Sequence, residues 1–199
     1  IKMLVVGPEK PLVNGIVDFF KNTNIKIFGP NKTASQLEGS KIFTKKLCKK
    51  YNIPTSKFEI FENKDEAIKY LDNSKYPIVI KADGLASGKG VYICKSNNEA
   101  KNAVSEIFDG KFGKADCVLV EEFLNGEEMS YFIISDGKEY KSFQTAQDHK
   151  RVGEGDTGPN TGGMGSYSPS RLSNKYLETK INEKIIEPTL AGLKKYNTE

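Results

Sequence analysis

The sequence contains few of the residues that build metal sites and disulfide frameworks. It has one histidine, His149, and three cysteines, Cys48, Cys94 and Cys117, with no CxxC pair among them. A single histidine excludes a multi-histidine metal site. Three scattered cysteines argue against a disulfide framework and indicate a reducing compartment. We therefore expect a cytoplasmic protein.

Long apolar runs and blocks of like charge are also missing. No segment is apolar enough for long enough to span a bilayer, and we expect no signal peptide. The net charge is only +4, and the lysines are interspersed with acidic residues. Neither a nucleic-acid nor a membrane partner is expected from such a pattern. The densest basic run, residues 45–50, falls on an expected helix, and we interpret it as that helix's solvent-exposed face.

Both ends of the chain fall at expected secondary structure. Ile1 lies within an apolar strand pattern, and Glu199 directly follows a helical pattern. We therefore expect the chain to be part of a longer protein.

The most informative stretch, residues 76–92, is a glycine-rich hairpin. An apolar, β-branched run predicts a buried strand that leads to Lys81, and a second strand begins at Val91. The tip between the strands contains Gly84, Ser87, Gly88, Lys89 and Gly90. Backbone N–H groups between two cations suit a triphosphate, because they bind anions without reading a base.

Two other interpretations of this hairpin are a Walker P-loop and a mobile surface loop. A Walker P-loop needs four residues before Gly-Lys and then Ser or Thr on a helix. Here only three residues separate Gly84 from Gly88, and Lys89 is followed by Gly90 and a strand. The spacing excludes that motif. A mobile glycine-rich tip with surface lysines is the other interpretation of this stretch taken alone.

The first part of the chain reads as a βαβ unit of a parallel sheet. The pattern predicts a strand at 2–6, a helix through 12–20 and a strand at 25–28. Glu9 lies in the loop after the first strand, where open α/β sheets bind ligands. A role in complementing the dipole of the following helix is equally compatible with its position.

The remainder alternates helices and strands before a long loop. A helix over 34–52 precedes a β-α-β-β-α-β order that predicts a compact α+β sandwich. Its other expected elements are the strand 58–61, the helix 64–71, the hairpin strands, the helix 97–108 and the strand 117–123. Strands at 130–135 and 139–147, joined by an Asp136-Gly137 turn, follow it. The glycine-rich loop 148–169 is expected to lack secondary structure, and a helix over 174–196 to kink at Pro188.

Five motifs now stand out together. They are Gly7-Pro8-Glu9-x-Pro11-Leu12-Val13, Gln36-Leu37-Glu38-Gly39-Ser40-Lys41, Lys81-Ala82-Asp83-Gly84-Leu85-Ala86-x-Gly88-Lys89-Gly90-Val91, Gln147-Asp148-His149-Lys150-Arg151 and Asp156-Thr157-Gly158-Pro159-Asn160-Thr161-Gly162-Gly163-Met164-Gly165. A strand end, Glu121-Glu122-Phe123-Leu124, is followed at the right interval by Glu128. Over the whole chain these motifs resemble the glycinamide ribonucleotide synthetase family of the ATP-grasp fold.

The resemblance implies a mixed α/β and α+β architecture, a partial ATP-grasp fold preceded by the end of an open parallel nucleotide-fold-like domain. We expect residues 1–33 to close that first domain and residues 34–53 to form a connecting helix. Residues 54–122 would form the lid subdomain, and residues 123–199 the first part of the large subdomain.

The resemblance also implies a reaction of de novo purine synthesis. The family joins glycine to 5-phosphoribosylamine with ATP through glycyl phosphate, giving glycinamide ribonucleotide, ADP and phosphate. The expected partners are these small molecules alone, and a monomer is expected. Two other functions are left open: another ATP-grasp carboxylate–amine ligase, and a non-catalytic nucleotide-binding module.

Nucleotide-binding residues follow from the same resemblance. Lys41 and Lys81 would hold the α- and β-phosphates, and the tip, from Gly84 through Ser87, Gly88 and Lys89 to Gly90, would close over the β- and γ-phosphates. The strand end Glu121, Glu122, Phe123 and Leu124 would bind adenine, with Glu121 accepting from its amino group, and Glu128 would accept the ribose hydroxyls. Lys81, Lys89 and Arg151 are the expected catalytic residues.

The acceptor site is expected in the loop that follows. Lys150 and Arg151 would receive the glycine carboxylate or the ribose 5-phosphate, and Asp148 would orient the amine. His149 is interpreted as a packed or surface residue, since acyl-phosphate chemistry needs no imidazole nucleophile. The other residues expected to contact substrate are Gly7, Pro8, Glu9, Asn160, Thr161, Gly162 and Gly163.

No metal ligand is expected within the chain. The family's Mg²⁺ ligands, which would also serve Mn²⁺, are expected beyond residue 199. We therefore expect the 199-residue chain to be inactive alone.

Overall fold

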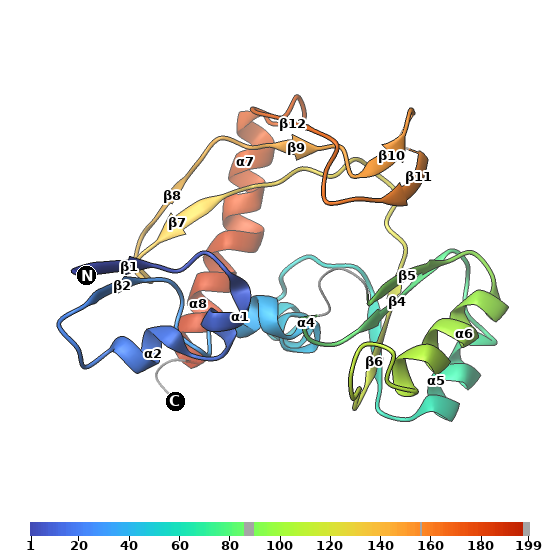
Figure 1. Cartoon of the computed structure of the whole chain (residues 1–199). Coiled ribbons are helices and arrows are strands. Elements are labelled where there is room, and N and C mark those ends of the chain that lie inside the picture. The colour runs from blue at the N-terminus through green and yellow to red at the C-terminus, as the bar shows by residue number, and fades with distance from the viewer. Residues whose placement is uncertain (86–89, 156, 197–199) are drawn as a thin grey trace. The chain divides into compact units, whose positions relative to one another are not determined.

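The computed structural model describes residues 1–85, 90–155 and 157–196 (Figure 1). The chain forms two compact units, each of which is described by itself. One contains residues 1–124 together with the end of the chain from Lys195, and the other contains residues 125–194. None of the helices within the described ranges has both the length and the apolar character needed to cross a membrane.

The chain begins with the predicted βαβ arrangement. Strand β1 (Met3–Val5) pairs in parallel with β2 (Lys26–Phe28), which confirms the parallel pair. The single helix predicted between them is wrong, because the structure has two, α1 (Glu9–Val13) and α2 (Ile16–Phe20). Gly15 separates them with a φ of +91°, a left-handed conformation that ends one helix before the next begins.

The helix predicted over 34–52 is likewise two helices, α3 (Gln36–Gly39) and α4 (Lys41–Lys50). Ser40 between them is extended, and its side chain accepts a 3.0 Å hydrogen bond from the Phe43 backbone N–H. A serine hydroxyl competes with the helical backbone in this way, so Ser40 starts a new helix as its N-cap.

The β-α-β-β-α-β prediction is confirmed. Strands β3 (Phe58–Phe61), β6 (Val118–Glu122), β4 (Ile78–Ala82) and β5 (Val91–Cys94) lie in that order in one antiparallel sheet. Helices α5 (Lys64–Leu71) and α6 (Asn97–Phe108) complete it. The side chains of Asn63 and Ser96 cap them at their N-termini.

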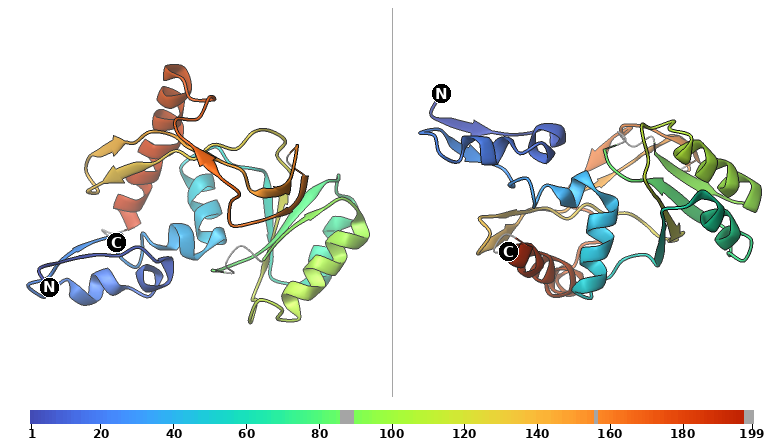
Figure 2. Two further views of the ribbon diagram at one scale, coloured as in Figure 1. Left: turned by 45° about the horizontal axis from the view of Figure 1, so that its top comes forward. Right: turned by 90° about the horizontal axis from the view of Figure 1, so that it is seen from below.

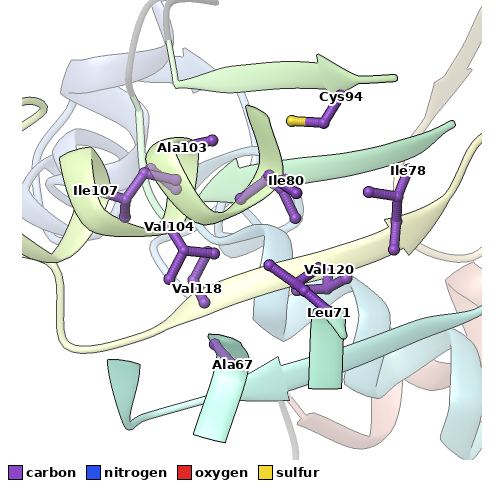
Figure 3. Close-up of a cluster of buried hydrophobic side chains, with 12 residues drawn as sticks. Ala67, Leu71, Ile78, Ile80, Cys94, Ala103, Val104, Ile107, Val118 and Val120 are labelled. Atoms are coloured by element: carbon purple, nitrogen blue, oxygen red, sulfur yellow. The ribbon is translucent and has the colours of Figure 1, made fainter. Parts of the chain in front are cut away.

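The two helices lie side by side and cover one face of this sheet (Figures 1 and 2). Between the layers is an apolar core of small and β-branched side chains (Figure 3). Ile78, Ile80 and Ala82 of β4 belong to this core. Because side chains alternate along a strand, Val79 and Lys81 point to the opposite face.

The second unit contains more structure than its sequence suggests. Strands β7 (Ile133–Ser135) and β8 (Tyr140–Ser142) form the predicted hairpin, with Gly137 at a φ of +88° in its turn. The prediction that the following loop lacks secondary structure is wrong. It contains two short antiparallel pairs, β9 (Gln147–Asp148) with β12 (Ser166–Tyr167) and β10 (Arg151–Gly153) with β11 (Thr157–Asn160).

The final helical segment is continuous but irregular. It consists of α7 (Lys175–Ile181), a π-helical turn at Asn182–Ile186 and α8 (Glu187–Tyr196). The irregularity lies just before Pro188 rather than at it. A proline ring clashes with the carbonyl four residues earlier, and a widened turn there accommodates the clash.

Candidate functional site

Lys81 lies near the carboxyl end of β4, on the face of the sheet away from α5 and α6. Its ammonium lies 3.0 Å from Glu121 Oε1 on the neighbouring strand β6. Backbone pairing holds the two strands in register, with Val79 opposite Glu121 and Lys81 opposite Leu119. Two residues from different parts of the sequence that were expected in the nucleotide site are therefore in contact.

Lys41 meets the beginning of the glycine-rich tip. Its ammonium donates a 2.8 Å hydrogen bond to the carbonyl oxygen of Gly84, where the chain turns with a φ of +88°. Burial lowers the pKa of Lys41, as does the nearby Lys81 ammonium, although Asp83 opposes both effects. Two cations and the turn at Gly84 thus occupy one small region.

Asp83, which has no role assigned from the sequence, holds this region together. Its carboxylate accepts hydrogen bonds from the Ser40 hydroxyl at 3.0 and 3.2 Å and from the Ile42 backbone N–H at 3.2 Å. A carboxylate at the N-terminus of α4 is favoured by the unpaired amide groups there. Alternation after Lys81 was the signal that could have revealed it, because residues two apart on a strand share a face.

Glu121 is buried, with only 5% of its surface exposed. Its second oxygen, Oε2, lies 3.0 Å from the Lys45 ammonium and accepts a 2.5 Å hydrogen bond from Ser56 Oγ. Burial alone would raise the pKa of Glu121, but the Ser56 hydroxyl and the lysines outweigh it and hold that pKa below its usual range. The expected contact of Glu121 with adenine stays a prediction.

Lys45 corrects an expectation. The sequence interpretation placed it on the exposed face of its helix, yet Lys45 is only 8% exposed. Its neighbours Lys46 and Lys49 are exposed as expected. Lys45 lies four residues after Lys41 and therefore on the same side of α4, which is the signal that could have identified it.

The rest of the predicted adenine-binding strand end is more open. Glu122 is exposed and accepts a 2.7 Å hydrogen bond from the Lys57 backbone N–H, and Leu124 is exposed. Phe123 is partly buried. A cavity of about 660 Å³ lies beside this strand end, but Ile78 and Tyr76 in its lining belong to the side of the sheet that α5 covers. Lys81 is not among the residues that line the cavity, so the cavity is not part of the site around Lys81.

In the second unit, two expected ligand-binding residues pair with each other. Lys150 Nζ donates a 2.7 Å hydrogen bond to Glu128 Oε1. This bond raises the pKa of Lys150, and the nearby Asp148 carboxylate adds to the effect. The sequence assigns Glu128 to the ribose and Lys150 to the acceptor substrate. The structure places these two side chains in direct contact.

The acceptor motif is folded around the backbone of Lys150. Its carbonyl oxygen accepts hydrogen bonds from the Thr161 backbone N–H at 2.6 Å and from Thr161 Oγ1 at 2.9 Å. The same hydroxyl accepts from the Gly163 N–H at 3.0 Å. Arg151 Nη1 donates to the Gly158 carbonyl at 3.3 Å. A methyl group added at Gly162 would meet nothing within 4 Å, so the backbone there is openly accessible.

His149 is an exposed residue whose ring stacks on Tyr167, with centroids 6.0 Å apart. Its backbone N–H donates to the Gly165 carbonyl, and its carbonyl accepts from the Met164 N–H. His149 is thus a surface residue, and the expectation that it takes no part in the chemistry stays a prediction.

Two groups of predicted residues remain to be placed. Gly7 and Pro8 precede α1, and Glu9 is its first residue, where both earlier interpretations of Glu9 remain compatible. Ser87, Gly88 and Lys89 lie outside the described residues, as does Asp156. Among the residues that are described, no group of three or more His, Cys, Asp or Glu side chains is arranged to hold a metal ion.

Comparison with known proteins covers the whole chain. Residues 1–38 match the N domain of phosphoribosylglycinamide synthetase, and residues 39–199 match its ATP-grasp (A) domain. A phosphoribosylamine–glycine ligase of Mesorhizobium japonicum is 52% identical over 194 residues, which is 97% of this chain and 46% of that protein. The chain thus spans about half the length of the curated relatives it matches.

Solved structures agree with these matches. The crystal structure of phosphoribosylamine–glycine ligase from Thermotoga maritima has a TM-score of 0.82 at 35% identity, covering 96% of this chain and 47% of that one. VanG D-Ala:D-Ser ligase from Enterococcus faecalis has a TM-score of 0.71 at 20% identity, covering 97% and 56%. The second similarity is one of fold alone.

Proposed function

Because this chain belongs to the phosphoribosylglycinamide synthetase family and has a partial ATP-grasp fold, we propose that its protein ligates glycine to 5-phosphoribosylamine using ATP. One observation carries the proposal. The 52% identity to a phosphoribosylamine–glycine ligase extends over 194 residues, and so includes the acceptor motif as well as the nucleotide-binding hairpin. The products would be glycinamide ribonucleotide, ADP and phosphate.

The cations at the hairpin suit a polyphosphate. Lys41 and Lys81 are partly buried. A hydrogen bond directs Lys41 to Gly84, just after β4, and an ion pair directs Lys81 to Glu121 on the neighbouring strand β6. We assign them to the α- and β-phosphates. When bound, ATP would activate the glycine carboxylate, which is otherwise a poor electrophile, by phosphoryl transfer. Such transfer depends on positioning and charge neutralisation more than on covalent catalysis.

The other nucleotide contacts stay as proposed from the sequence. Adenine is assigned to the strand end of Glu121, Glu122, Phe123 and Leu124, and the ribose hydroxyls to Glu128. Phosphate binding is also assigned to the tip residues, which are Gly84, Ser87, Gly88, Lys89 and Gly90.

The folded acceptor motif supports a site for the second pair of ligands. Lys150 and Arg151 are assigned to the glycine carboxylate and the ribose 5-phosphate, and Asp148 to the amine. The Lys150–Glu128 pair is largely exposed, and such pairs contribute roughly 0–1 kcal/mol. Ligand binding could therefore break it at small cost. The remaining assigned contacts are Gly7, Pro8, Glu9, Asn160, Thr161, Gly162 and Gly163.

The proposed ligase has four broader properties. Mg²⁺ or Mn²⁺ would be held by residues outside this chain, and no metal-dependent step is assigned to the described residues. The chain alone would be inactive. The protein would be monomeric and cytoplasmic. Its domain division would follow residues 1–33, 34–53, 54–122 and 123–199.

The experiment is to measure ADP release by the full-length protein with and without glycine and phosphoribosylamine. We expect release only when both are present. Lys81→Ala should lower kcat by about 10²–10³, because it removes a cation that neutralises the phosphates of the leaving ADP during phosphoryl transfer. Lys95→Ala, an exposed lysine just after β5, is the matched control and should leave the rate unchanged.

Two results would count against the proposal. ATP cleavage that neither substrate stimulates would reject the acceptor assignment. Equal rates for Lys81→Ala and Lys95→Ala would reject the assignment of Lys81.

A further inference from the structure

The Lys45 ammonium is surrounded by four oxygen atoms. It donates to Thr55 Oγ1 and Ser56 Oγ, each at 2.6 Å, and to the Ser56 carbonyl at 3.4 Å, and it lies 3.0 Å from Glu121 Oε2. An ammonium has three protons to donate, so these partners are enough to engage all of them. The Lys45 ammonium is therefore held in one position, against the same face of the sheet from which the Lys81 side chain projects.

Glu121 stands between two lysines that differ in exposure. Oε2 faces Lys45, whose side chain is 10% exposed, and Oε1 faces Lys81, whose side chain is 26% exposed. One cation would be enough to neutralise one buried carboxylate. A second buried charge is not explained by stability, because buried ion pairs seldom add net stability over apolar packing. Two lysines and one carboxylate leave the cluster of Lys45, Glu121 and Lys81 with a net charge of about +1. Lys81 is the more exposed of the two lysines, so this positive charge is accessible on its side.

We propose that Lys45 is a positioning residue: together with Ser56 it fixes the Glu121 carboxylate, which in turn holds the Lys81 ammonium where a nucleotide phosphate can meet it. Lys45 itself touches no ligand in this arrangement. The inference rests on the proposed function, in which Lys81 binds the phosphates. Neither the family matches nor the sequence motifs assign Lys45 this role.

The geometry explains why such a support is needed. A lysine side chain has a long flexible stem, and loss of its partner would let the ammonium occupy several rotamers. Glu121 restrains Lys81 only if its own carboxylate cannot rotate. Two contacts on Oε2, from Lys45 and Ser56, prevent that rotation. Groups that position reacting parts gain their effect by being locked themselves.

The test measures ADP binding to the full-length protein by calorimetry, because ADP carries the phosphates assigned to Lys41 and Lys81. Lys45→Met removes the charge and keeps the length of the side chain. We expect it to weaken ADP binding about 10- to 100-fold, as for a misplacement of about 1 Å in a binding group. Lys45→Arg should restore part of the affinity. Lys46→Met, the same charge change at an exposed position of α4, should leave the affinity unchanged.

A pH series separates positioning from simple loss of stability. The charged groups that face Glu121 are Lys41 and Lys45 of α4 and Lys81 of β4. Without Lys45, the ionised form of Glu121 is favoured less, so the acid limb of ADP binding should move to higher pH. Titration of ADP itself is the same in every variant and cancels in the comparison.

Ser56→Ala keeps the proposal testable if Lys45→Met does not fold. Ser56→Ala removes one contact on Glu121 Oε2 and leaves both ion pairs of Glu121 in place. It should weaken ADP binding and move the acid limb of that binding to higher pH, each by less than Lys45→Met does. Variants that lower Tm but bind ADP as the wild type does would overturn the positioning role. If the wild type binds ADP while glycine and phosphoribosylamine fail to stimulate its release, the ligase proposal fails separately. Failure of the wild type to bind ADP would overturn both.

Discussion

At the scale of single residues, the structure changes how two charged side chains are understood. Lys45 belongs to a basic run that reads as a solvent-exposed helix face, yet it is buried against Glu121. Asp83 has no role assigned from the sequence, yet it binds the start of α4. Each has its partner in a different strand or helix. A charge can be buried only when such a partner is present, and local sequence does not reveal it.

Asp83→Ala should destabilise the protein. The substitution removes the acceptor for the Ser40 hydroxyl and the Ile42 N–H, and so leaves the N-terminus of α4 less satisfied. We expect a loss of about 1–2 kcal/mol in the free energy of unfolding, as for loss of a helix cap. Denaturant unfolding of the two proteins measures it.

Asp116→Ala is the matched control for this change. Asp116 is exposed and pairs with the exposed Lys114, so its removal should change stability very little. An equal loss for the two aspartates would show that the contacts of Asp83 with α4 contribute nothing.

At the scale of helices and strands, single residues decide where helices break. Apolar periodicity runs through both predicted long helices, but Gly15 and Ser40 interrupt them. Gly15 adopts a left-handed conformation, and Ser40 is extended and caps α4. Periodicity reports which residues face the core, and that pattern continues across a break when the two helices pack on the same neighbour.

Gly15→Ala should destabilise the first segment. At a φ of +91°, an alanine is strained by about 1–2 kcal/mol, and its methyl group would approach the Lys32 side chain at 3.3 Å. The flexible Lys32 side chain can move aside, so the backbone strain should dominate. The free energy of unfolding of the variant measures this loss.

Gly7→Ala in the same segment is the comparison. Its added methyl group meets nothing within 4 Å, and its backbone is not left-handed. Alanine should be tolerated there, because it restricts the unfolded chain without straining the folded one. If Gly15→Ala were as stable as Gly7→Ala, the helix break would not depend on the left-handed glycine.

At the scale of the whole molecule, the chain combines two units with different kinds of stability. The first contains the apolar core between α5, α6 and the four-stranded sheet. The described part of the second unit has few buried residues and relies on short strand pairs and hydrogen bonds in its acceptor motif. The buried charge cluster lies in the first unit, so acid should affect that unit's stability through Glu121.

Glu121→Gln should change the pH dependence of unfolding. The pKa of Glu121 is lowered in the folded state, so its carboxylate stabilises the fold fully above the unfolded value of roughly 4.3. That contribution is lost as the pH falls through the lower folded value. The difference in unfolding free energy between wild type and variant should therefore be wide at neutral pH and narrow below about pH 4.3. Urea unfolding over a pH series measures it.

Glu59→Gln provides the control, since Glu59 is an exposed carboxylate on the neighbouring strand β3. Other acidic groups titrate in every variant and cancel in the differences. A wild-type to Glu121→Gln difference of the same size at about pH 3 and at about pH 7 would show that Glu121 contributes no pH-dependent stability.

The sequence by itself determined the kind and order of most elements. The strands of the four-stranded sheet, helices α5 and α6 and the β7–β8 hairpin follow from patterns within a dozen residues: apolar periodicity, caps and a turn pair. A match to a family compares the chain with the family residue by residue, so the sequence alone is enough to show family membership.

Only the tertiary structure decided which charges meet. Ser40 and Asp83 are 43 residues apart, and Ser56 and Glu121 are 65 apart, so no local pattern joins them. The same holds for Lys150 and Glu128, 22 residues apart. The physical reason is that an ion pair or a buried hydrogen bond depends on distance in space, whereas secondary-structure signals depend on distance along the chain.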